Sequence, residues 1–266
     1  MSPPGRPWPH AGVPTGAAAA TGWRRRDLRL LLLALLMLVA WDASGWDLAL
    51  SRQFGDAGGF AWRQAWWARG LLHDGGRVLA WACLGAVVLG LWRPWLAGPT
   101  RAQRLYWLGV LLACLLLVPA LKRWSLTSCP WDLAMFGGTA AYVPHWRPGV
   151  ADGGGGHCFP SGHAVSAFAF FALYGLWRPH RPRLARGLLL LTLLFGLLSG
   201  WTQLVRGAHF ASHALWSAWL CAAVVVLARP LAPGLGGGPD WPVAGSGADG
   251  QQGLGLGPQV VQQLGQ

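Results

Sequence analysis

The sequence predicts an all-α integral membrane protein, a bundle of about six transmembrane helices. Hydrophobic residues make up 53% of its 266 residues and charged residues only 11%, whereas soluble domains carry about 25% charged residues. Six segments approach the roughly 20 apolar residues that a bilayer core requires. They are residues 28–46, 78–96, 103–121, 163–179, 186–205 and 210–228. This composition excludes an ordinary soluble globular protein.

The basic residues predict the orientation in the membrane. The net charge of +12 does not indicate a nucleic-acid partner, because the cations cluster at the ends of the apolar segments. The N-terminal arm, the second-to-third connection, the fourth-to-fifth connection and Arg229 together hold 13 of the 21 cations. Positive residues favour the cytoplasmic side. We therefore expect cytoplasmic termini in a bacterial inner membrane, with residues 122–162 and 203–209 on the exterior, periplasmic face.

The chain divides into three parts. Residues 1–23 are rich in Pro, Gly and Ala, and residues 230–266 are rich in Gly, Pro and Gln. Neither segment shows apolar periodicity, which predicts a disordered arm and a disordered tail. Residues 24–229 form the predicted membrane domain. Its first segment resembles a signal peptide, but residues 42–45 offer no convincing small-x-small cleavage site, so an uncleaved signal anchor is preferred.

Polar residues gather where the predicted topology turns to the exterior. Lys122, the single lysine of the chain, ends the third segment, CFPSGHA (158–164) opens the fourth, and RGAHFASH (206–213) opens the sixth. Helix N-termini with free N–H groups bind anions, and a Ser-Gly step lets the backbone approach a phosphate. The chain has no Glu, so a paired-glutamate mechanism is excluded. These features predict a phosphate pocket that contains two histidines.

These motifs resemble those of the type 2 phosphatidic acid phosphatases, membrane lipid phosphate phosphatases related to vanadium haloperoxidases. The family pattern is Lys, six residues, Arg-Pro; Pro-Ser-Gly-His; and Ser-Arg, five residues, His, three residues, Asp. Here six residues separate Lys122 from Cys129-Pro130, and Pro160-Ser161-Gly162-His163 follows. Thr202-Gln203 precedes His209 and His213 at the family spacing. The resemblance covers about residues 100–228.

The resemblance implies a lipid phosphatase that needs no metal or other cofactor and whose partners are its lipid substrate and the bilayer. His209 is the expected nucleophile, which forms a phosphohistidine, and His163 the expected acid for the leaving alkoxide. Lys122, Ser161, Gly162 and Arg206 are expected to bind the phosphate.

The departures from the family pattern leave several questions open. Cys129 and Gln203 stand where the family has arginines, so either Arg206 or Arg123 is expected to supply a guanidinium. His213 replaces the family aspartate and can accept a hydrogen bond from His209 only when it is neutral. Cys129 and Cys158 are the two cysteines of the predicted exterior face and are expected to form a disulfide, the alternative being two free thiols.

Other interpretations remain. A lipid-phosphate-binding protein without turnover would explain the missing arginines and aspartate, and a haem or metal protein could use His163, His209 and His213. His73 and His145 are interpreted as caps or interfacial groups, and so are Asp42 and Asp47 near the end of the first segment. The sequence does not identify the lipid substrate, which could be phosphatidate, phosphatidylglycerol phosphate, a polyprenyl diphosphate or a lipid A phosphate. It does not indicate the oligomeric state either.

Overall fold

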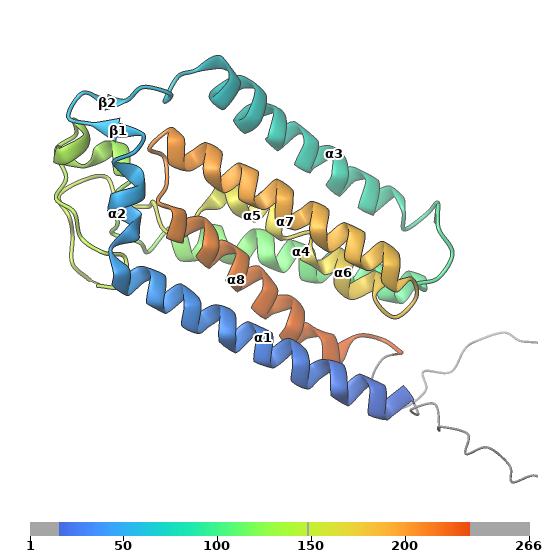
Figure 1. Ribbon diagram of the computed structural model, residues 1–266. Helices are drawn as coiled ribbons and strands as arrows, with labels where there is room; N and C mark the ends of the chain where they lie inside the picture. Colours follow the sequence, from blue (N-terminus) through green and yellow to red (C-terminus); the bar gives the residue numbers. More distant parts are fainter. Residues whose placement is uncertain (1–15, 148, 235–266) are drawn as a thin grey trace, which may run out of the picture.

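The computed structural model describes residues 16–147 and 149–234 of the chain, and its long helices run side by side in one bundle (Figure 1). The long helices are α1 (Gly16–Ser44), α3 (Gly75–Leu89), α4 (Arg101–Lys122), α7 (Pro182–Val205) and α8 (Ala211–Ala228). The shorter elements are α2 (Trp46–Ser51), β1 (Gly55–Asp56), β2 (Gly59–Phe60), the π-helix η1 (Trp67–Asp74), the 3-10 helices η2 (Pro130–Asp132), η3 (Ala134–Phe136) and η4 (Arg229–Leu231), α5 (Gly162–Phe168) and α6 (Phe171–Trp177). The all-α prediction is confirmed.

Four helices in the described part of the chain are long and apolar enough to cross a bilayer: Trp67–Leu89, Arg101–Lys122, Pro182–Val205 and Ala211–Leu231. The pair α5 and α6 forms a shorter apolar unit, Gly162–Trp177, which at 1.5 Å per residue is about 24 Å long against a bilayer core of about 30 Å. α1 is 29 residues long but carries Arg24, Arg25, Arg26 and Asp27. Six spans therefore remain a prediction.

Three helix boundaries differ from those expected. α1 begins at Gly16 instead of after residue 23, because its first turns are rich in alanine, the best helix former. The segment expected at 78–96 begins at Trp67 and ends at Leu89, ahead of the helix-breaking Pro94. The segment expected at 163–179 is divided between α5 and α6. Residues 1–15 and 235–266 of the predicted arm and tail lie outside the described residues.

α5 and α6 lie at the centre of the bundle, where they pack against α4, α7 and α8. Two glycines allow this close packing. A Cβ at Gly196 of α7 would lie 2.2 Å from the ring of Phe168, and a Cβ at Gly175 of α6 would lie 2.2 Å from the ring of Trp107. Small residues commonly let helices approach each other in this way inside membranes.

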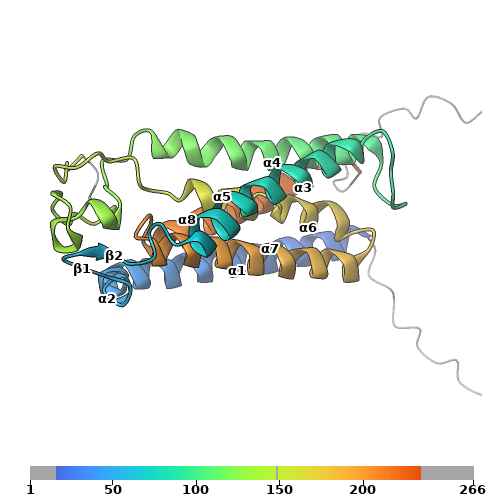
Figure 2. The ribbon, with the colours of Figure 1, turned by 90° about the horizontal axis from the view of Figure 1, so that it is seen from above.

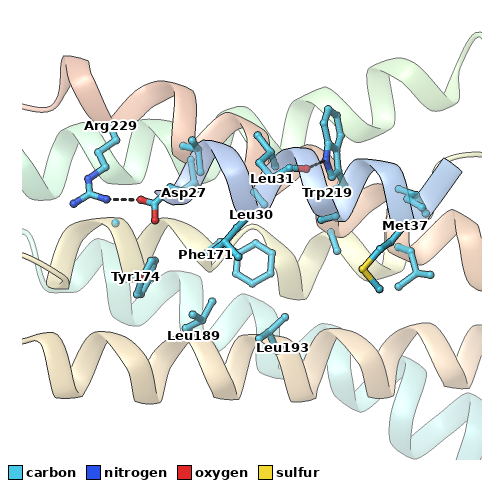
Figure 3. A pocket seen from close by; sticks show the side chains of 18 of the residues that line it. Asp27, Leu30, Leu31, Met37, Phe171, Tyr174, Leu189, Leu193, Trp219 and Arg229 are labelled. Atoms are coloured by element: carbon cyan, nitrogen blue, oxygen red, sulfur yellow. Dashed lines mark hydrogen bonds and ion pairs between the residues drawn. The ribbon is translucent and has the colours of Figure 1, made fainter. Parts of the chain in front are cut away.

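The two ends of the bundle differ in charge. At one end, which we call the basic end, Asp27 Oδ2 of α1 accepts hydrogen bonds from Arg178 Nη1 (2.5 Å) and Arg229 Nη1 (2.6 Å). These residues line one side of an apolar cavity of about 530 Å³ between α1, α6, α7 and α8 (Figure 3). The connection between α6 and α7 and the first turn of α4 lie at this end as well, and they carry further arginines.

The opposite end, which we call the loop end, holds most of the irregular chain (Figure 2). α4 ends there, α5 and α8 begin there, and the β1–β2 hairpin and the 3-10 helices η2 and η3 cover it. An apolar cluster separate from the core of the bundle joins these parts. It contains Phe60, Leu133, Phe136, Ala140 and Phe210. The loop end is therefore a packed cap.

Candidate active site

Three segments far apart in the sequence meet at the loop end. Lys122 is the last residue of α4, and its Nζ lies 4.0 Å from the position that a Cβ on Gly162 would occupy. Its charge acts electrostatically on both His163 and His209. The single lysine of the chain therefore lies beside the first turn of α5, near two histidines.

The Pro-Ser-Gly-His turn is fixed to α8 by hydrogen bonds. Ser161 is fully buried and caps α5, where its Oγ accepts a bond from Ala164 N (3.4 Å). Ser161 N donates to the carbonyl of His213 (3.1 Å). Ser217 Oγ of α8 donates to the carbonyl of Ser161 (2.9 Å). The turn and the start of α8 therefore hold each other in place.

His209 and His213 face each other within the protein. His209 lies in the connection between α7 and α8 and is 3% exposed, and His213, in the first turn of α8, is fully buried. The two Nδ1 atoms are 3.5 Å apart, so a proton on one of them can be shared with the other. His209 Nδ1 thus faces His213, which leaves Nε2 as the nitrogen available to a ligand.

His163 and Arg206 complete the cluster with unpaired polar atoms. The ring centroid of His163 lies 6.4 Å from that of His209. His163 Nδ1, Arg206 Nη1 and His213 Nε2 are buried without a hydrogen-bond partner among the described residues. Buried polar atoms are nearly always satisfied. A bound anion would satisfy the guanidinium, so this site fits a phosphate group.

The two candidate arginines are placed differently. Arg206 is 7% exposed, and its Nε donates to the carbonyl of Arg63 (3.2 Å). Its charge acts on His163. Arg123 follows Lys122 in the chain but is exposed. The structure therefore brings Arg206, and not Arg123, into the cluster of histidines.

A disulfide joins Cys129 and Cys158, whose Cα atoms lie 5.2 Å apart. The bond closes the loop between these two cysteines, which follows α4. It thereby joins Cys129 to Cys158, two residues before Pro160. Cys158 Sγ lies 3.4 Å from His209 Nδ1. Cys129, Cys158 and His209 also offer three potential metal-ligand atoms within 4.8 Å of one another, but the disulfide leaves no thiolate for a metal.

Two histidines that the sequence analysis interpreted as caps or interfacial groups lie in or beside this cluster. The ring of His73, from η1, lies 4.1 Å from the ring of His163, and its Nδ1 bonds Asp74 Oδ1 (2.8 Å). The ring of His145 lies 5.5 Å from that of His213. One sequence signal does exist for His73. It forms a His-Asp pair at an apolar segment, where ionisable residues are energetically costly and therefore indicate a functional site.

Burial controls the charge state of His209. The low-dielectric surroundings lower the pKa of His209 well below its usual value, and the neighbouring Lys122 and His163 lower it further. The ring is therefore neutral at physiological pH. A neutral imidazole beside a lysine, an arginine and a second imidazole can attack phosphorus while the cations neutralise the phosphate oxygens.

Comparison with known proteins agrees with this geometry. Residues 103–234 match the model of the PAP2 superfamily. This range includes all but the first two residues of α4, the disulfide, the Pro-Ser-Gly-His turn, His209 and His213. Neither a curated protein nor a solved structure matches the chain significantly. The match and the site within it place the chain in the PAP2 superfamily, whose members are typically phosphatases.

Proposed function

We propose that this protein hydrolyses a phosphate monoester or a diphosphate on a membrane lipid, without a metal, through a phosphohistidine at His209. The observation that carries the proposal is the orientation of His209. Its Nδ1 faces His213 Nδ1 at 3.5 Å and Cys158 Sγ at 3.4 Å, so Nε2 is left for in-line attack on phosphorus.

The neighbouring groups supply the rest of the reaction. His163 donates a proton to the leaving lipid alkoxide, and then takes a proton from the water that attacks the phosphohistidine. Lys122 and Arg206 neutralise the charge on the equatorial phosphate oxygens, which dominates catalysis of phosphoryl transfer. Ser161 and the Gly162 N–H, beside Lys122, are assigned to the same phosphate. The products are the lipid alcohol, or the lipid monophosphate from a diphosphate, and inorganic phosphate, and His209 returns to its neutral form.

A lipid substrate is supported by the position of the site. The cluster lies at one end of a bundle that contains four helices long enough to cross a membrane. The basic end is the opposite one, and positive residues favour the cytoplasm. We propose that the loop end faces the exterior of a bacterial inner membrane, where lipid headgroups can reach it from the adjoining leaflet.

The test is phosphate release by the purified full chain in detergent, without added metal. The panel contains phosphatidate, phosphatidylglycerol phosphate, a polyprenyl diphosphate and lipid A phosphate. We expect at least one to be hydrolysed by the wild type and not by His209→Ala. Binding of a lipid phosphate without turnover by the wild type would favour the alternative, a phosphate-binding protein that has lost catalysis.

A further inference from the structure

We propose that Asp42 of α1 is a positioning residue for His209 and acts through His145 and His213, an inference that rests on the proposed function. Position 213, where the family has an aspartate, holds a histidine here. The carboxylate of Asp42, on a helix outside the family match, bonds His145, and the ring of His145 lies 5.5 Å from that of His213. Two residues, His145 and His213, separate Asp42 from His209, whereas the family aspartate occupies position 213 itself.

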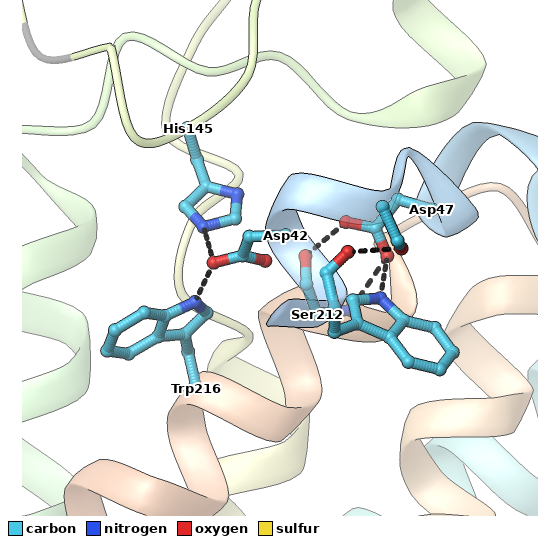
Figure 4. Close-up of polar contacts among 7 residues, drawn as sticks. Asp42, Asp47, His145, Ser212 and Trp216 are labelled. Carbon is cyan, nitrogen blue, oxygen red and sulfur yellow. Dashed lines mark hydrogen bonds and ion pairs between the residues drawn. The ribbon is translucent and has the colours of Figure 1, made fainter. Parts of the chain in front are cut away.

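Asp42 holds His145 in a buried network (Figure 4). Its Oδ2 accepts hydrogen bonds from His145 Nε2 (3.2 Å) and Trp216 Nε1 (2.8 Å). The side chains of Asp42 and His145 are each only 7% exposed. The ring of His145 also stacks on Phe159 at 4.1 Å, with an interplanar angle of 13°. Both the position and the tilt of the imidazole are thus fixed.

His145 in turn helps to hold the ring of His213. Three rings meet His213 nearly edge to face: His145 at 5.5 Å, Phe159 at 5.2 Å and Phe210 at 5.3 Å. His145 is the polar member of this cage. Because His213 lies 3.5 Å from His209 through its Nδ1, a shift of its ring changes the orientation of the nucleophile.

A second carboxylate fixes the start of α8. The N-cap residue of α8, Phe210, has no capping side chain. Asp47 of α2 accepts bonds from Ser212 N (3.0 Å), from Ser212 Oγ and from Trp41 Nε1 (2.9 Å). The carboxylates of Asp42 and Asp47 therefore both support the turn of α8 that carries His213.

The chemistry of the intermediate explains why a carboxylate is needed here. When His209 Nε2 bonds phosphorus, its ring becomes cationic, and a neutral His213 cannot compensate that charge. Asp42 retains one buried oxygen, Oδ1, without a partner among the described residues. An anion with spare capacity thus lies next to His145, the ring that contacts His213.

The same residues do not make a convincing metal centre. Asp42, Asp47 and His145 offer ligand atoms within 4.8 Å of one another. However, both oxygens of Asp47 and Oδ2 of Asp42 already accept bonds from indole, hydroxyl, backbone or imidazole donors. A metal would have to displace or share these donors, so we assign the cluster to hydrogen bonding.

The test compares Asp42→Asn in two backgrounds. In the wild type, the substitution should lower kcat about tenfold with little change in KM, a size typical of coupled residues. In a His213→Asp background, a carboxylate contacts His209 directly, so Asp42→Asn should change kcat less than about twofold. Asp56→Asn is the matched control, because Asp56 is exposed and its side chain bonds Gly58 N in the hairpin turn.

Several results would overturn the proposal. An equal loss in both backgrounds would show that Asp42 only supports the fold, and a change confined to KM would show that it acts on substrate binding. Inactivity of His213→Asp itself would show that a carboxylate cannot replace this imidazole. Stoichiometric metal in the purified wild type that is lost in Asp42→Asn would make the cluster a metal site.

A binding readout separates this inference from the proposed function. Orthovanadate imitates the pentacoordinate phosphate and bonds an imidazole nitrogen, and its affinity is measurable without turnover. We expect Asp42→Asn to weaken vanadate binding about tenfold in the wild type and less than about twofold with His213→Asp. Unchanged affinity in the wild-type background would contradict the role of Asp42 even if no lipid phosphate proves to be a substrate.

Discussion

At the scale of single residues, the candidate site combines the imidazoles of His209 and His163 with two cations, Lys122 and Arg206. His209 offers Nε2 because its Nδ1 faces Cys158 Sγ at 3.4 Å and His213 Nδ1 at 3.5 Å. The ring centroid of His163 lies 6.4 Å from that of His209. In the proposed mechanism, the nucleophile and the proton donor thus come from different elements.

The first prediction concerns these two histidines. His209→Ala and His163→Ala should each lower kcat at least about a thousandfold, and the double variant should lose little more, because groups that act as a unit are strongly non-additive. The measurement is phosphate release by each purified variant. Losses that multiply in the double variant would show that the two rings act independently.

The second prediction separates the two arginines. Arg206→Ala should lower kcat/KM about a hundredfold or more, since removing one donor to a transition-state oxyanion typically costs that much. Arg123→Ala is the matched control and should stay near the wild-type value, because Arg123 is exposed. The opposite ranking would assign the missing guanidinium to Arg123.

The third prediction follows from the charge state of the nucleophile. Because the pKa of His209 is held well below its usual value, the reactive neutral ring persists as the pH falls through about 6.5, the usual histidine pKa. In the pH profile of kcat/KM, the acid limb is the fall in activity caused by protonation of His209. This limb should therefore lie well below pH 6.5. Lys122→Gln removes a neighbouring cation, which raises the pKa of His209 and should move the limb upward. A limb that stays in place would contradict the electrostatic link.

At the scale of elements, the long helices were predictable and the short ones were not. Apolar length predicted α4, α7 and α8, because a helix that crosses a bilayer leaves a continuous signal. The division between α5 and α6 and the π-helix η1 leave no such signal. Nor did the spacing indicate that η1 places His73 against His163, since this contact depends on how η1 packs beside α7.

The fourth prediction tests the close packing of α5 and α6. Gly175→Ala and Gly196→Ala should each lower thermal stability, by about 1–3 kcal/mol, because the added methyl overlaps the rings of Trp107 and Phe168. Gly109→Ala in α4 is the control, since its Cβ would meet nothing within 4 Å. Equal stabilities of the three variants would contradict the tight packing of these helices.

The fifth prediction concerns the disulfide. Under denaturing, non-reducing conditions a thiol reagent should label Cys83, Cys114 and Cys221, the free cysteines, while Cys129 and Cys158 should react only after reduction. Closing a loop with a sequence separation of 29 residues contributes about 3–4 kcal/mol on the chain-entropy estimate. A Cys129→Ala, Cys158→Ala double variant should therefore unfold at a lower temperature. Labelling of both positions before reduction would exclude the bond.

At the scale of the whole molecule, the bundle separates the basic end from the loop end, which holds the candidate site. The sequence identified the motif residues of the candidate site because their spacing lies within one family pattern, residues 103–234. It did not identify Asp42, Asp47 and His145, because their contacts with α8 span sequence separations of up to 174 residues. Such contacts arise only when α1 packs along α8.

The central claim is that His209 becomes phosphorylated, and rapid-quench labelling tests it most directly. The purified full chain is mixed with a lipid substrate that carries ³²P in its terminal phosphate and is quenched within milliseconds. We predict a label that is stable to base, labile to acid, mapped to the peptide containing His209, and absent from His209→Ala. Steady turnover with no such label, or an equal label on His209→Ala, would contradict the phosphohistidine mechanism.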